Sequence, residues 1–200
     1  MFRFDNILEA WACIYKPLSH DINGHGRKTF YRIDTINNNN EFVQNYNLAA
    51  TPCMAYSTLV DASRARANAK SISYRHSIYF MVKQAAPQHN AKTVVNDADA
   101  ETDAKYYADE MVQDLLAFLD ELKKESQRAI NGNSTHQPQT AIERIVSALP
   151  KEEQMGINGL QLDGAEWGTF PMKYNRWWVC GLEIEQISPR LLCVNGEKYY

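Results

Sequence analysis

The clearest hydrophobic pattern in the chain lies between Asp97 and Ile130. Apolar side chains recur there at steps of three and four residues, at Ala104, Tyr107, Met111, Leu115, Phe118 and Leu122. This spacing places them on one face of an α-helix, and charged side chains occupy the opposite face. Acidic residues gather at the start of the segment and basic residues at its end, which matches the helix dipole. The pattern therefore predicts one long helix whose apolar stripe needs a partner surface.

Strict alternation of apolar and polar positions predicts the main strands. Ser71–Gln84 alternates along its whole length, and a second apolar run, Cys53–Val60, precedes it. Small and basic residues separate these two runs. We expect the runs to pair as a long antiparallel hairpin, residues 53–84, whose tip carries Arg64, Arg66 and Lys70. Arg176–Gln186 alternates as well and predicts a further strand with one buried face.

Shorter segments complete the predicted order of elements. A helix is expected at Asp5–Tyr15 and a strand at Thr29–Asp34. A short helix is expected at Ala141–Leu149, capped by Thr140, because Glu143 stands at the capping-box position. A strand is expected at Gly156–Asp163, followed by a loop or turn around Trp167.

Helices and strands are segregated along the chain rather than alternating as βαβ units. This order predicts an α+β fold, an antiparallel sheet with a long hairpin, packed on one face by a long central helix and shorter helices. A length of 200 residues suits a single domain. We expect residues 1–200 to form it, with the extended hairpin at 53–84 and a C-terminal tail at 187–200.

Composition excludes several classes of protein. A formal net charge of −3 argues against a general nucleic-acid coat, which would be basic. The four cysteines form no CxxC pair and fit no zinc module, so we expect reduced thiols. The N-terminus lacks the apolar segment of a signal peptide, and no apolar run approaches the ~20 residues that span a bilayer. We therefore expect a protein made in the cytoplasm, with no membrane partner.

The chain carries no recognisable catalytic motif. His20 and His25 share a glycine-containing loop but lack further metal ligands in sequence, and His76 falls on a predicted strand. Acidic residues 97–103 lack the central glycine of a calcium loop. Glu183 and Glu185 share one strand face and would need a pocket to act as a catalytic pair. We predict no catalytic, cofactor-binding or metal-binding residues, and no cofactor.

Aromatic and basic residues supply the candidate contact surfaces instead. Trp177 and Trp178 are adjacent on a strand, so their side chains point to opposite faces and one of them leaves the core. The outward tryptophan either marks a protein–protein interface or is covered by a short helix or the C-terminal tail. The candidate interface residues are Arg64, Arg66, Lys70, Trp177, Trp178, Tyr199 and Tyr200.

The order of elements resembles that of the tail-completion, tail-terminator and neck (head–tail connector) proteins of tailed bacteriophages. The corresponding segments are Asp5–Tyr15, Thr29–Asp34, Cys53–Gln84, Asp97–Ile130 and Arg176–Gln186. The resemblance implies a non-enzymatic virion protein that forms a homo-oligomeric ring of about six or twelve copies at the head–tail junction or the tail end. It also implies contacts with neighbouring connector and tail proteins and with DNA passing through the lumen.

Two other classes remain open at the level of sequence. One is a small cytosolic enzyme or ligand-binding protein whose site combines scattered residues such as His76, Trp178 and Glu183. The other is a ring subunit of a contractile or secretion apparatus. The first class would need a buried pocket lined by those residues.

Overall fold

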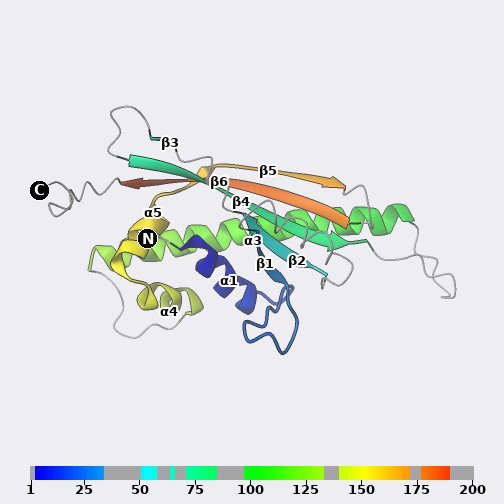
Figure 1. Ribbon diagram of the computed structural model, residues 1–200, viewed down its shortest axis with the longest axis horizontal. Coiled ribbons are helices and arrows are strands. Elements are labelled where there is room, and N and C mark those ends of the chain that lie inside the picture. Colours follow the sequence, from blue (N-terminus) through cyan, green and yellow to red (C-terminus); the bar gives the residue numbers. More distant parts are fainter. Residues whose placement is uncertain are drawn as a thin grey trace, which may run out of the picture.

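The computed structural model describes residues 3–33, 51–57, 64–65, 71–84, 97–132, 140–171 and 177–189. Figure 1 shows the arrangement of the helices and strands. The helices are α1 (Phe4–Ile14), α3 (Asp97–Ile130), α4 (Ala141–Ala148) and α5 (Lys151–Asn158). The strands are β1 (Phe30–Ile33), β2 (Cys53–Ser57), β3 (Arg64–Ala65), β4 (Ser71–Lys83), β5 (Leu160–Pro171) and β6 (Trp177–Pro189).

The strands form one sheet in the order β1-β2-β4-β6-β5, with β3 paired to β4. β4 pairs antiparallel with both β2 and β6, and β5 pairs antiparallel with β6. The predicted 53–84 hairpin therefore exists as the β2–β4 pair, with Arg64 of β3 opposite Ser73. β1 pairs parallel with β2, so the expectation of a wholly antiparallel sheet is wrong and the sheet is mixed. Parallel strands need a long connection between them, and the segment between β1 and β2 is long enough for this arrangement.

The long helix α3 runs beneath the sheet, and the shorter helices lie on the same side (Figure 1). The predicted α+β architecture is confirmed. The predicted apolar stripe of α3 packs against the sheet. Its residues Met111, Leu115 and Leu122 are fully buried there. The core-facing side of β4 joins the same cluster through Ile78 and Phe80. At about 25 cal/mol per Å² of apolar surface, this burial is the main stabilising term of the fold.

The segment after α4 differs from its prediction. Residues 151–158 form α5, and the strand that follows does not end near residue 163 but continues to Pro171. The expected loop around Trp167 is therefore wrong. A register shift between Gln161 and Glu166 inserts extra residues into β5 and changes the phase of its alternation. The period-2 signal is interrupted there, which explains why the strand looked like a loop.

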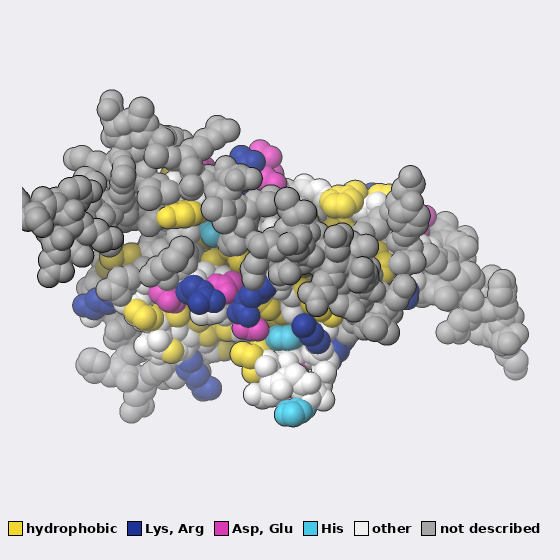
Figure 2. All heavy atoms as spheres, viewed as in Figure 1, with side chains coloured by type: hydrophobic (Ala, Val, Ile, Leu, Met, Phe, Trp, Pro, Cys, Tyr) yellow, Lys and Arg dark blue, Asp and Glu magenta, His cyan; other side chains and the backbone are white. Residues whose placement is uncertain are grey.

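Ionic contacts hold α1 to the first strand. The Arg32 guanidinium on β1 lies 3.0 Å from an Asp5 carboxylate oxygen and 2.7 Å from one of Glu9. Figure 2 shows basic and acidic side chains interspersed over α1. Arg3 also pairs with Asp5 at 2.8 Å, and its bond is the main cause that lowers the pKa of the Asp5 carboxyl. The contacts set the angle at which the helix packs.

Candidate functional site

The predicted basic tip is described only in part. Arg64 lies in β3, directly opposite Ser73 of β4. Arg66, Lys70, Tyr199 and Tyr200 lie outside the described residues. For these four residues the interface role remains a prediction.

The two adjacent tryptophans lie on opposite faces of β6, and neither is exposed. Trp178 joins the main core, whereas Trp177 joins a second apolar cluster on the other face of the sheet. Their exposed fractions are 9% and 1%. The alternative of an exposed tryptophan at this position is therefore wrong for the single chain. The second cluster consists of Cys53, Ala55, Met81, Trp177 and Val179, with partly buried Tyr31, Ile33 and Tyr79 packed against it.

Two exposed aromatic side chains lie on β5, in the region where a loop is expected from the sequence. Trp167 is 47% exposed and Phe170 is 48% exposed. Trp167 lies opposite Leu182 on the helix side, and its Nε1 donates a 3.0 Å hydrogen bond to Asp109 of α3. Phe170 lies opposite Val179 on the other face. β5 is an edge of the sheet among the described strands, so both faces of this edge offer apolar surface.

An open groove of about 420 Å³ crosses the face of the sheet that α3 does not cover. Its floor is a row of directly opposed positions, Tyr79 on β4, Gly181 on β6 and Gly168 on β5. Two neighbouring strands thus lack a side chain at the same level. A Cβ placed on Gly168 would meet nothing within 4 Å, whereas one on Gly181 would lie 3.5 Å from the Tyr79 ring and 3.7 Å from Phe170. The groove has aromatic walls and a backbone floor.

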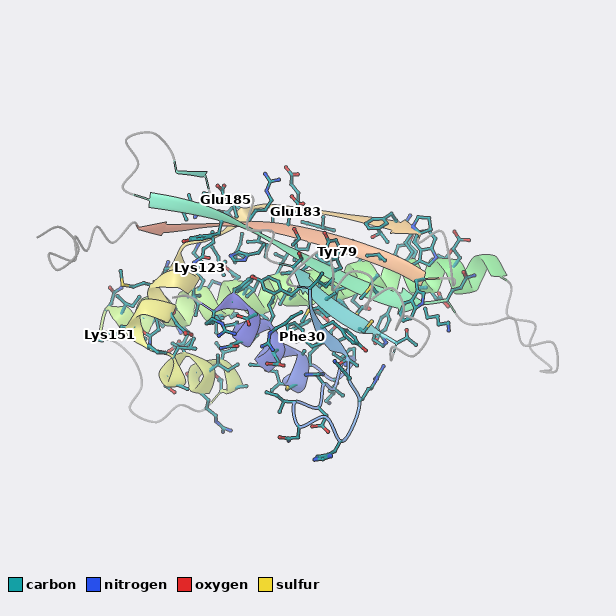
Figure 3. The ribbon with its side chains drawn as sticks, viewed as in Figure 1. Phe30, Tyr79, Lys123, Lys151, Glu183 and Glu185 are labelled. Atoms are coloured by element: carbon teal, nitrogen blue, oxygen red, sulfur yellow. The ribbon has the colours of Figure 1, made fainter. Side chains whose placement is uncertain are left out.

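Glutamates line the other side of the groove. Glu166 and Glu183 lie directly opposite each other in the next row of the β5–β6 pair. Glu185 lies two residues further along the same face of β6, and Figure 3 shows Glu183 and Glu185 pointing away from α3. Arg75 reaches Glu183 at 3.6 Å, and both side chains are more than half exposed. The two β6 glutamates thus lie on an exposed sheet face, and a shallow groove adjoins it.

The residues suggested for an enzymatic site do not line a common pocket. His76 and Trp178 belong to the core side of the sheet, whereas Glu183 belongs to the opposite face. His76 is instead part of a buried hydrogen-bond chain. Its Nε2 donates to Gln186 Oε1 at 2.9 Å, and its Nδ1 accepts from the Tyr56 hydroxyl at 2.8 Å. Burial lowers the pKa of His76, so the neutral form is favoured.

Metal and thiol chemistry find little support in the described part of the chain. No group of three or more His, Cys, Asp or Glu side chains there could hold a metal ion. Cys13, Cys53 and Cys180 are free thiols, as expected. Burial raises the pKa of each, in the case of Cys53 to about 12, which disfavours the nucleophilic thiolate. No described helix combines the length and the apolar character needed to cross a membrane.

Comparison of the chain with protein-family models, with curated proteins and with solved structures gives no match.

Proposed function

We propose that this protein is a non-enzymatic structural subunit of a phage virion that assembles into a homo-oligomeric ring at the head–tail junction or the tail end. The supporting observation is the edge strand β5, which presents Trp167 and Phe170, each nearly half exposed, on its two faces. Large exposed aromatics beside open strand backbone are typical of surfaces that pair with another chain. The predicted element order supplies the link to the phage family.

The area that a stable interface buries favours assembly through several surfaces rather than through β5 alone. A stable interface buries on the order of 800 Å² on each partner. The edge of β5 and the groove beside it lie apart from Arg64, which pairs with Ser73 on the other side of β4. A subunit with two different contact surfaces joins its neighbours head to tail, and such contacts form a ring when the rotation between neighbours closes.

The decisive experiment is the native mass of the purified full chain, measured by light scattering over a range of concentrations. Negative-stain images at high concentration accompany it. We expect a closed ring of about six or twelve copies, the number that the resemblance to phage ring proteins implies. A chain that stays monomeric at every concentration contradicts the proposal.

A matched pair of variants tests whether the edge strand β5 takes part in assembly. Trp167→Ser removes an aromatic from exposed β5, and Tyr106→Ser removes one from α3, where the side chain is 68% exposed. We expect the first substitution to weaken assembly at least tenfold and the second to leave it unchanged. Thermal unfolding of both variants shows whether the fold is retained.

A further inference from the structure

The groove on the open face of the sheet has an apolar floor and an acidic side. Its floor is open where Gly168 lies on the edge strand β5, and it runs inward across Gly181 to the Tyr79 ring. Phe170 bounds one side and the opposed pair Glu166–Glu183 bounds the other. An apolar stem can lie on the glycine floor against the two rings, while a charged head reaches the carboxylates.

The charges around the groove favour the binding of a cation. Like charges directly opposite each other on neighbouring strands are unfavourable, and Glu166 and Glu183 stand in that relation. Of the two opposed carboxylates, that of Glu183 has the Arg75 guanidinium at 3.6 Å. The Arg75–Glu183 pair is exposed and therefore weak.

Lysine and arginine are the side chains that match this surface. Either cation is attracted to an aromatic ring face and to carboxylates at once. The segment Arg64–Lys70 carries three such residues and no acidic one.

We propose that the groove of one subunit docks the basic segment Arg64–Lys70 of a second copy of this chain. Arg64 pairs with Ser73, six residues from Tyr79 along β4. Six residues of strand span about 20 Å. This docking rests on the proposed ring function, and it names the two surfaces that meet: the tip of one subunit and the groove of the next.

A charge exchange tests the docking. The variant Glu166→Lys/Glu183→Lys reverses the groove, and Arg64→Glu/Arg66→Glu/Lys70→Glu reverses the tip. Each alone is expected to weaken self-association, measured by light scattering of the full chain, at least tenfold. The two sets combined in one chain restore opposite charges and are expected to recover most of the lost association.

Filling the groove provides a test without any change of charge. Gly168→Val places a side chain into open space, and its control Gly164→Val does the same outside the groove, where a Cβ also meets nothing within 4 Å. We expect assembly to be lost in the first variant and kept in the second, with equal thermal stability.

The outcomes separate the two proposals. Wild-type rings whose mass is unchanged in the groove-reversed and Gly168→Val chains overturn the docking and leave the ring function standing. A failure of the combined charge exchange to recover association, with both folds intact, also overturns the docking. Wild-type protein that is monomeric at all concentrations overturns both.

Discussion

Tyr15, the C-cap residue of α1, donates a 2.6 Å hydrogen bond from its hydroxyl to Asp114 Oδ2 of α3. These residues are 99 positions apart in the sequence. Burial and the bonded carboxylate raise the pKa of the Tyr15 hydroxyl, so it stays protonated and keeps donating. The Tyr15 ring also stacks on Trp11, with 4.3 Å between the ring centroids. One residue thus joins the first helix to the long central helix.

Replacing Tyr15 by Phe tests this link. The ring and its stacking remain, and the hydrogen bond is lost. We expect the free energy of unfolding to fall by about 1 kcal/mol, the usual net contribution of one such bond. Denaturant titration measures the change. The control Tyr106→Phe removes a hydroxyl from an exposed position on α3 and should have no effect; an equal loss in both variants would contradict the assignment.

Leu115 and Leu116 form a natural pair for the core of α3. Leu115 is fully buried under the sheet, whereas Leu116 is only partly buried at the edge of the cluster. Leu115→Ala should lower the free energy of unfolding by about 2–5 kcal/mol, because transfer and cavity costs add. Leu116→Ala should cost clearly less. Similar losses at both positions would mean that the helix is rotated from its described orientation.

Gly159 is the position where a methyl group should do most harm. A Cβ there would collide with the backbone carbonyl oxygen of Ile187, which cannot move without breaking the 2.8 Å hydrogen bond from Ile187 N to Gly159 O. We expect Gly159→Ala to destabilise the protein by about 1–3 kcal/mol, the range for an overpacked site. Gly164→Ala, with open space around its Cβ, is the control for thermal unfolding. A tolerated Gly159→Ala would show that α5 does not approach β6 as described.

The buried His76 makes stability depend on pH. Burial lowers its pKa below the ordinary value of 6.5, so around pH 6 the unfolded chain binds more protons than the native state. Stability is then full above about pH 6.5 and falls as the pH decreases, by at most about 1.4 kcal/mol per pH unit for one group. Burial lowers the pKa of His20 as well and adds a change of the same sign.

Unfolding titrations between pH 5 and 8 measure this slope. The His76→Gln substitution should reduce the slope of stability against pH and leave the contribution of His20. His25→Gln, at an exposed position, should leave the slope as it is in the wild type. An identical slope in the His76→Gln protein would show that His76 is not held in its neutral form.

Local patterns predicted the elements that local physics determines. The bounds of α3 follow from its apolar stripe, and the capping box at Thr140 forms as expected, with Thr140 Oγ1 accepting from Glu143 N at 3.1 Å. β4 and β6 follow from alternation. Each of these signals lies within a few neighbouring residues, so no knowledge of distant contacts is needed.

The sheet edge and the groove could not be predicted from the sequence, because they depend on contacts between residues that are distant along the chain. The parallel β1–β2 pair, the burial of Trp177 and the course of β5 through two glycines and a register shift have no local signature. Alternation tells which residues share a face, but it does not tell which strand lies alongside or what covers that face.

By itself, the sequence determined the α+β class, the long helix and the strand faces, because helical and strand periodicity are properties of adjacent residues. Only the tertiary structure decided that Gly168 meets Gly181 and that Glu166 meets Glu183. Register between strands is set by packing of the whole sheet, and the candidate contact surface is a product of that register.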